Sequence, residues 1–378
     1  MKVLYVLHST IMGGATISFI NMVVGLRDKG YSMVVVFPDN NESFIAKLDA
    51  LGISHYHCPI VMSVFSPDYS KKSVYKRARC WLRLLKEKWK SWKQLSLIIK
   101  KEKPDIVHTN VGVVHEGLFC SRRFRIPHVW HLREYQDKDF GWRVFPSKSF
   151  FVNELKSSYV VSITKDVLFS FGLQESPMHR VIYNGVFSKE DATIEMPKKK
   201  FFLCASRISE EKGHMDVVKT FSTFHRYHPE YRLVVLGFGN NSFINSLKEL
   251  CKQLGCDDSV VFEGYRNDVK PYMKLASALI VASRSEGFGR MTAEAAFCGC
   301  LVIGRNTGGT REILESIGGL TFDSNEGLLS SMNEVAAMTD EEYGKRVSLS
   351  QIKALALYST EKNVQDMDKF YHTIMIDI

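Results

Sequence analysis

Residues 1–37 read MKVLYVLHSTIMGGATISFINMVVGLRDKGYSMVVVF. Val3–Leu7 is a continuous apolar run, which is typical of a strand buried on both faces of a parallel sheet. A loop with two glycines follows, then an apolar pattern that fits a helix ending near Gly30, and then a second apolar run at Met33–Phe37. A strand, a glycine loop, a helix and a strand in this order predict the start of a doubly wound α/β fold.

The same alternation continues along the 378 residues, a length for which two domains are expected. Further strands are predicted at Ser54–Pro59, Asp105–Asn110, His128–His131, Val160–Thr164 and Arg180–Asn184. The polar stretch Lys189–Lys200 contains Pro197 and is typical of a linker. The pattern then restarts, with strands predicted at Phe201–Ser206, Leu233–Leu236, Val260–Phe262, Ala278–Ala282 and Leu301–Gly304, and helices at His214–His225 and Phe243–Leu254. We therefore predict two α/β domains, 1–187 and 188–359, and a C-terminal helix at about 360–378 that belongs to the first.

The composition indicates which partners and which cellular compartment to expect for the chain. Its net charge of +9 favours anionic partners such as nucleotides, phosphates or an anionic membrane surface. Eight cysteines occur without a C-x-x-C pair, so we expect free thiols in a reducing cytosol. The N-terminal segment is too short and too interrupted by glycine for a signal peptide, and no apolar run is long enough to span a membrane.

A second informative stretch is Ala282–Gly309, ASRSEGFGRMTAEAAFCGCLVIGRNTGG. It predicts a buried strand that ends, a glycine turn, and a helix that begins near Arg290. The first N–H groups of such a helix favour an anion. Glu286 in the turn and Glu294 one turn into the helix are acceptors that suit the hydroxyls of a sugar or a ribose. The alternative is that Glu286 is a loop charge and Glu294 a solvated helix residue.

Two cations follow the first strand of the second half, in the loop SRISEEKG. Strand ends of a doubly wound sheet face the ligand crevice, and a guanidinium with an ammonium suits a diphosphate. Arg207 and Lys212 are therefore candidate phosphate ligands, although both could instead pair with Glu210 and Glu211. In the first half, the backbone at Gly13-Gly14 could likewise face a phosphate, or could be an ordinary turn.

Residues 71–103 form an unusually basic segment, with thirteen lysines and arginines against two acids. Tryptophans and leucines are interleaved at spacings of three and four, as in a helix that lies on an anionic membrane surface. The alternative is an exposed helix whose apolar side packs on its own domain. Nucleic acid is not expected as a partner, because no RNP, zinc-finger or KH pattern occurs.

Taken together, these residues resemble a known family. SRISEEKG followed by S-E-G-F-G-x-x-x-x-E at 285–294 is similar to the family 4 glycosyltransferases, also called glycosyl transferases group 1. Other segments agree in the same order, namely Gly13-Gly14-Ala15, HVWHLRE, VIYNGV, LGFG, VVFEGY and NTGGTREIL. Residues 61–100 match nothing in that family.

The resemblance implies the GT-B fold, in which two Rossmann-like domains face each other across a cleft that holds the site. It implies a retaining sugar transfer from a nucleotide-sugar donor, which we expect to be a UDP-sugar. We expect no metal dependence, because Arg207 and Lys212 are available to neutralise the diphosphate. Arg207 and Lys212 would neutralise the diphosphate and Glu286 would bind sugar hydroxyls. Glu294 would hold the ribose. Backbone groups would contact the donor at Gly14, Arg266, Phe288, Gly289, Arg290 and Met291.

On the acceptor side, the resemblance places His131 near the transferring sugar, whereas position alone favours a strand-end histidine bound to backbone. Arg133 and Glu134 could touch the acceptor, and Glu263 is expected to be structural. No residue is expected to hold a metal or a cofactor. Asp137–Asp139 and Asp366–Asp368 are D-x-D triplets that could arise by chance, and His55, His57 and Cys58 lack a further ligand.

The predicted function is transfer of a sugar to a hydroxyl of a saccharide acceptor, such as a polyprenyl-diphosphate-linked saccharide, in surface polysaccharide assembly. The protein would work in the cytoplasm, peripherally on the inner face of the cell membrane. Two alternatives stay open. A nucleotide-sugar 2-epimerase shares the fold and needs no acceptor, and a non-catalytic nucleotide-binding partner protein would lack turnover.

Overall fold

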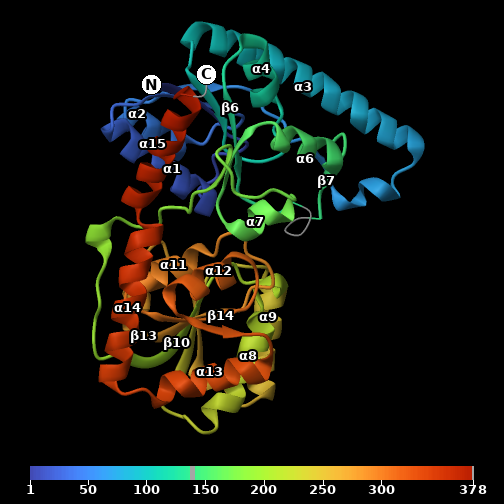
Figure 1. Ribbon diagram of the computed structural model, residues 1–378. Coiled ribbons are helices and arrows are strands. Elements are labelled where there is room, and N and C mark those ends of the chain that lie inside the picture. Colours follow the sequence, from blue (N-terminus) through green and yellow to red (C-terminus); the bar gives the residue numbers. More distant parts are fainter. Residues whose placement is uncertain (137–140, 377–378) are drawn as a thin grey trace. The chain divides into compact units, whose positions relative to one another are not determined.

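The computed structural model describes residues 1–136 and 141–376. The chain forms two compact units, each built on its own parallel sheet (Figure 1). The first unit comprises Met1–Gly185 and the C-terminal stretch from Asn363, and the second comprises Val186–Lys362. The predicted boundaries lie at residue 187 and near residue 360. The predicted α/β class is confirmed by the two sheets.

The first unit has a seven-stranded sheet in the order β3-β2-β1-β5-β6-β8-β9, with every adjacent pair parallel. The strands are β1 (Lys2–Val6), β2 (Ser32–Phe37), β3 (Ser54–His57), β5 (Ile106–Thr109), β6 (His128–Leu132), β8 (Tyr159–Ser162) and β9 (His179–Val181). Each lies on a predicted run, although β3, β8 and β9 end two or three residues earlier than expected. The order reverses between β1 and β5, which is where open α/β sheets bind ligands at the carboxyl ends of their strands.

Alternate side chains of β1 enter two separate cores. Val3 and Tyr5 pack with α1 (Gly14–Asp28), α2 (Glu42–Ala50) and α15 (Thr360–Ile376). Leu4 and Val6 pack on the other face with α3 (Val74–Glu102) and α4 (Glu116–Phe124). Burial on both faces explains why the strand is apolar throughout.

Shorter elements complete the first unit. They are α6 (Lys148–Lys156), α7 (Lys165–Ser170), a 3-10 turn at Pro67–Lys71 and the antiparallel pair β4 (Val64–Phe65) and β7 (Arg143–Val144). The sequence did not predict β4 and β7, because two residues are too few to show a period.

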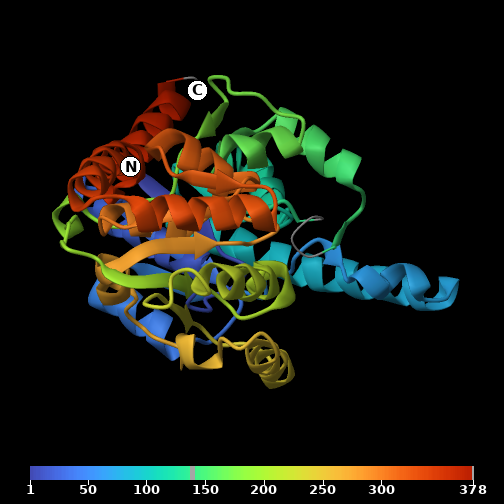
Figure 2. The same cartoon turned by 90° about the horizontal axis from the view of Figure 1, so that it is seen from below.

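The helix α3 has two different halves. Its second half enters the core through Leu95, Ile98 and Ile99. Its first half, drawn in blue to cyan, extends away from the sheet of the first unit (Figure 2). There Leu82 and Trp89 are 68% and 60% exposed. Among the residues that the structure describes, no helix is both long enough and apolar enough to cross a bilayer.

The second unit has a six-stranded parallel sheet in the order β12-β11-β10-β13-β14-β15. The strands are β10 (Lys199–Ala205), β11 (Arg232–Leu236), β12 (Val260–Gly264), β13 (Ala276–Val281), β14 (Leu301–Arg305) and β15 (Leu320–Phe322). The helices are α8 (His214–His225), α9 (Asn241–Gln253), α10 (Lys270–Leu275), α11 (Arg290–Phe297), α12 (Gly308–Ile317), α13 (Asn325–Ala337) and α14 (Asp340–Tyr358), with 3-10 turns at Lys189–Asp191, Glu210–Lys212 and Asp257–Ser259. All strands but β15 were predicted. The order reverses between β10 and β13, so the loops after these two strands meet at the ligand-binding edge.

The predicted linker is part of the second unit. Asp191 Oδ1 lies 2.9 Å from Lys270 Nζ, and Gln351 Nε2 donates to Thr193 O over 3.0 Å. These contacts bind the stretch before β10 to the body of the unit.

The candidate metal ligands have structural partners. The His55 ring stacks on Phe37 with centroids 5.8 Å apart, and Cys58 is buried. In the second D-x-D triplet, Asp368 lies on α15, where it pairs with Lys29 and accepts from Tyr31. The first triplet, Asp137–Asp139, lies outside the described residues. Within residues 1–136 and 141–376, no group of three or more His, Cys, Asp or Glu side chains could hold a metal ion.

Candidate active site

Two loops meet at the point where the second sheet reverses its strand order. Residues 206–213 follow β10, and residues 282–289 follow β13. Gly213 has a φ of 73°, and a Cβ at this position would lie 2.3 Å from Ala282 O. A glycine is therefore needed for the two loops to approach. Arg284 N donates to Glu211 O over 2.9 Å, which joins the two predicted motifs into one structural unit.

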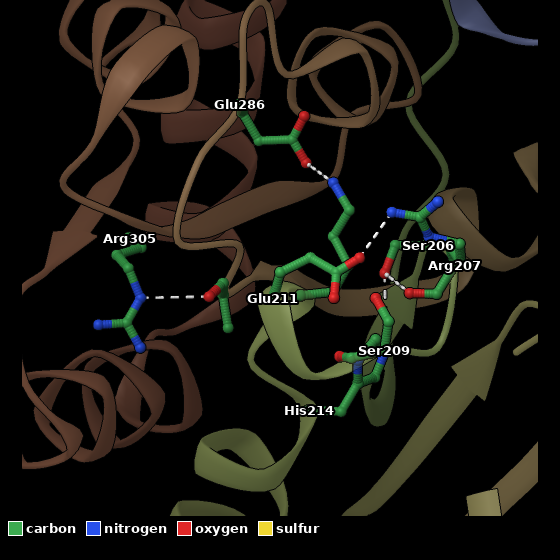
Figure 3. Close-up of polar contacts among 9 residues, drawn as sticks. Ser206, Arg207, Ser209, Glu211, His214, Glu286 and Arg305 are labelled. Atoms are coloured by element: carbon green, nitrogen blue, oxygen red, sulfur yellow. Dashed lines mark hydrogen bonds and ion pairs between the residues drawn. The ribbon is translucent and has the colours of Figure 1, made fainter. Parts of the chain in front are cut away.

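The two loops bring Lys212 and Glu286 into direct contact. Lys212 Nζ lies 2.5 Å from Glu286 Oε1 (Figure 3). Their side chains are 19% and 23% exposed, so both are partly shielded and both can still be reached by a ligand. An ammonium beside a carboxylate offers a phosphate ligand next to an acceptor for sugar hydroxyls.

Arg207 is placed differently. Its guanidinium donates to Glu211 Oε1 over 2.6 Å, which is the alternative pairing that the sequence left open (Figure 3). The Arg207 side chain is 58% exposed. An exposed ion pair of this kind contributes only ~0.2–1 kcal/mol, so Arg207 can exchange Glu211 for a phosphate at little cost.

The turn before α11 presents backbone to the same edge of the sheet. Gly289 is the N-cap of α11, with φ 86°, and the helix begins at Arg290 as predicted. A glycine cap has no side chain with which to cover the first N–H groups, so these can face an anion. The Phe288 ring is buried against Tyr358, with centroids 5.9 Å apart. Phe288 therefore anchors the turn, and only its backbone can serve a ligand.

The start of α12 packs against the turn that precedes α11. Gly309 N donates to Glu286 O over 2.8 Å, and a Cβ at Gly309 would lie 2.3 Å from Phe288 O. Any larger residue at Gly309 would push the turn out of place. Arg305 adds a second support, because its Nε donates to Ala282 O over 3.1 Å at the end of β13 (Figure 3).

Glu294 lies one turn into α11. Its Oε1 is 2.5 Å from Arg290 Nε, and Arg290 also donates to Val186 O over 3.0 Å. Burial raises the pKa of Glu294, and the guanidinium of Arg290 opposes that rise. A carboxylate has about four lone-pair sites, so Glu294 can accept from a ribose while it is held by Arg290.

The loops after β11 and β12 carry two aromatic residues that were not among the predicted site residues. Phe238 and Tyr265 are each 62% exposed, and their ring centroids lie 5.8 Å apart. Both lie within two residues of the end of a strand, in LGFG and VVFEGY, and that position was the signal that could have identified them. Arg266 is next in sequence and pairs with Glu263. An exposed aromatic pair at a strand end suits stacking of a nucleobase.

The first unit holds the other predicted residues. Gly14 is the first residue of α1 and is exposed, so this helix start is open to a ligand. His131 is the second-last residue of β6 and its side chain is buried, with Nδ1 3.1 Å from His108 Nε2. Arg133, which the prediction allowed to touch the acceptor, is buried. Its guanidinium donates to Asn110 Oδ1 over 2.8 Å and to Asn184 Oδ1 over 2.9 Å.

Comparison with known proteins shows which enzyme family the chain is similar to. The family model described as glycosyl transferases group 1 matches residues 188–347. Alpha-monoglucosyldiacylglycerol synthase of Streptococcus pneumoniae is 26% identical over 72% of this chain and 71% of its own length. A Campylobacter jejuni protein, N-acetylgalactosamine-N,N'-diacetylbacillosaminyl-diphospho-undecaprenol 4-alpha-N-acetylgalactosaminyltransferase, is 29% identical over 28% of each chain. Of the first three curated relatives, the matches cover 33%, 62% and 71% of the relative's own length.

Solved structures agree on the fold. Alr3699/HepE of Anabaena, crystallised in complex with UDP, superposes with a TM-score of 0.78 at 19% identity, over 99% of this chain and 100% of the other. Residues 188–347 are similar to the glycosyl transferases group 1, and the chain has the GT-B fold.

Proposed function

We propose that the protein transfers a sugar from a nucleotide-sugar donor to a hydroxyl of a saccharide acceptor. The observation that carries this proposal is the contact between Lys212 and Glu286, 2.5 Å long, beside the glycine-capped start of α11. A cation, a set of helix N–H groups and a carboxylate lie together at the ligand-binding edge of the sheet. This combination matches a diphosphate joined to a sugar.

The mechanism follows from the movement of charge. As the bond between the anomeric carbon and the phosphate oxygen breaks, negative charge grows on the leaving diphosphate. Lys212, Arg207 and the first N–H groups of α11 stabilise that charge more in the transition state than in the ground state. We propose same-face attack with retention, because no carboxylate at these loops is assigned as a nucleophile. The departing phosphate oxygen takes the proton of the acceptor hydroxyl.

The proposed donor is a UDP-sugar. The Anabaena structure with the same fold was crystallised with UDP, and Phe238 with Tyr265 provides an aromatic edge for a pyrimidine. Glu294 would accept from the ribose hydroxyls, and backbone near Arg266 would contact the base. We propose that no metal is needed, because Arg207 and Lys212 supply the positive charge that a divalent ion would otherwise bring.

For the acceptor we propose a lipid-linked saccharide, for example one carried on a polyprenyl diphosphate, in surface polysaccharide assembly. Two relatives have names that include a lipid, diacylglycerol in one and diphospho-undecaprenol in the other. The first half of α3 supports this choice. An exposed apolar stripe of Leu82, Leu85 and Trp89 runs beside a row of exposed cations, which are Arg79, Arg83, Lys86, Lys90 and Lys93.

Such a helix suits the surface of an anionic membrane. Each cation near the lipid headgroups contributes ~1 kcal/mol, and the apolar stripe adds burial among the acyl chains. We therefore propose a peripheral position on the cytoplasmic face of the cell membrane, where a lipid-linked acceptor would be presented.

The experiment that tests the transfer is a screen of nucleotide sugars by thermal shift, followed by an assay for nucleotide release with and without saccharide acceptors. A donor at 100 times its Kd stabilises the fold by about 2.7 kcal/mol. Nucleotide release that requires an acceptor supports the proposal. Conversion of the donor alone into an epimer would show a 2-epimerase, and binding without turnover would show a non-catalytic partner protein.

A further inference from the structure

A chain of polar side chains crosses the interior of the first unit and ends at His131. Tyr5 Oη lies 3.1 Å from Tyr371 Oη, and Tyr371 Oη lies 2.6 Å from His108 Nδ1. His108 Nε2 then lies 3.1 Å from His131 Nδ1. All four side chains are at most 1% exposed, so their hydrogen bonds must be satisfied by one another.

Arg133 determines the direction of these hydrogen bonds. Its Nη2 lies 3.5 Å from His131 Nδ1, and a guanidinium has donors only. A ring N–H at Nδ1 would point at this cation, whereas a lone pair is attracted to it. His131 Nδ1 is therefore the unprotonated nitrogen, and the neutral ring carries its proton on Nε2.

The remaining positions follow in sequence from this assignment. Since His131 Nδ1 accepts, His108 donates from Nε2 and has a lone pair on Nδ1. Tyr371 then donates to His108 and accepts from Tyr5. Burial, followed by the charge of Arg133, lowers the pKa of both His108 and His131 well below 6.5, so both rings are neutral at pH 7.

The other end of the chain is His131 Nε2. This atom is buried and has no hydrogen-bond partner among the described residues. An N–H that is buried without a partner costs ~1–3 kcal/mol, and a ligand oxygen would remove that cost.

We propose that Arg133, His108 and Tyr371 hold His131 as the Nε2–H tautomer, and that His131 donates a hydrogen bond from Nε2 to a ligand oxygen at the carboxyl end of β6 instead of acting as a base. His108 and Tyr371 are positioning residues, and the C-terminal helix α15 supplies the second of them. The identity of the ligand rests on the proposed function. The direction of the hydrogen bonds does not.

The tautomer can be measured without turnover. Long-range proton–nitrogen NMR spectra of the full chain with labelled histidine, assigned with His131→Gln, should show a protonated Nε2 and an unprotonated Nδ1 at His131. The reverse pattern would overturn the inference and would leave the proposed transfer untouched. Absence of turnover with every donor would instead remove the proposed transfer and leave the tautomer result intact.

Kinetics then test the role. His131→Gln keeps an N–H donor that does not titrate. Its kcat/KM should therefore be about tenfold or more above that of His131→Leu, since one hydrogen bond is typically worth about a factor of ten. Equal loss in both variants would indicate a base and would overturn the inference.

Tyr371→Phe removes the donor to His108 and should lower kcat about tenfold, by the same reasoning. The matched control is Tyr31→Phe, since Tyr31 also binds α15, through Asp368 Oδ1 over 2.7 Å. That control should lower thermal stability and leave kcat unchanged. Equal kcat values in the two variants would show that Tyr371 only docks the helix.

Discussion

Lys212 Nζ and Glu286 Oε1 lie 2.5 Å apart although the two residues are separated by 74 positions in the chain. The contact forms because β10 and β13 are neighbours, so the loops at their carboxyl ends must meet. The pair places opposite charges at one point of the two loops, and this arrangement suits the proposed phosphorylated sugar.

Removing either member of this pair should abolish most turnover. We expect Glu286→Ala and Lys212→Ala each to raise the barrier by about 3–4 kcal/mol, a loss of about 10²–10³ in kcat. The double variant should lose less than the sum, because the residues contact each other. The measurement is steady-state kinetics with the donor found in the screen.

The control for that prediction is Glu341→Ala, which breaks an exposed pair with Lys345 on α14. It should leave kcat and thermal stability unchanged. Full activity in Glu286→Ala would show that the site is assigned to the wrong loop.

Gly309→Ala should damage donor binding without touching a charged group. The new Cβ would lie 2.3 Å from Phe288 O, so the turn that carries Glu286 must shift. We expect a stability loss of ~1–3 kcal/mol and a weaker affinity for the nucleotide, measured by thermal unfolding and calorimetric titration. Gly344→Ala is the matched control, because its Cβ would meet nothing within 4 Å on α14 and should be stabilising by ~0.5–1 kcal/mol.

Reversing charge along the first half of α3 should release the protein from anionic vesicles. The variant replaces Arg83, Lys86, Lys90 and Lys93 by Glu. Four contacts at ~1 kcal/mol each correspond to a loss of more than about a hundredfold in partitioning, measured by vesicle sedimentation. Lys88 is left intact, because its ammonium lies 2.9 Å from the buried carboxylate of Glu116 and its loss would damage the fold.

The control replaces four exposed lysines elsewhere by Glu, so its net charge changes by the same amount. They are Lys47, Lys156, Lys219 and Lys252. It should bind vesicles nearly as well as the natural protein. Equal binding by both variants would mean that α3 is an exposed helix with no membrane role.

Buried histidines should make the first unit sensitive to acid. Burial, as the largest cause, lowers the pKa of His115 and of His128 to about 3. The unfolded chain therefore binds more protons between pH 3 and 6.5, so stability is complete above 6.5 and falls as pH decreases below it. Each group contributes up to about 1.4 kcal/mol per pH unit in that window.

All five tryptophans lie in the first unit, so their fluorescence during urea unfolding reports on that unit. The pH dependence of the free energy of unfolding should be shallower in His128→Asn than in the natural protein. An unchanged slope would mean that His128 becomes protonated within the fold.

The sequence was most informative where strands are buried on both faces. The apolar runs of β1, β2, β10 and β13 located both sheets, because parallel strands must exclude polar residues from either side. It was uninformative for β4, β7 and β15, which have two or three residues and therefore no measurable period.

For the candidate site, residue types at fixed spacing predicted Lys212 and Glu286, and the structure brings them into contact. Pairing could not be predicted for Arg207, because Glu210, Glu211 and a phosphate are all chemically suitable partners. Nor could the partners of Arg133 be predicted, because its buried guanidinium donates to Asn110 and Asn184, which are distant in the sequence. Side-chain direction at a strand end depends on tertiary packing that a local pattern does not contain.

The C-terminal helix has a consequence for the order of events during synthesis. The strand β1 contributes Tyr5 to the buried polar chain, and α15 contributes Tyr371, but the whole second unit lies between them in the chain. The ribosome therefore synthesises the second unit before it synthesises α15, the helix that completes the core of the first unit. The N-terminal sheet must wait with Tyr5 and His108 uncovered, and this interval is when a chaperone would be most useful to the nascent chain.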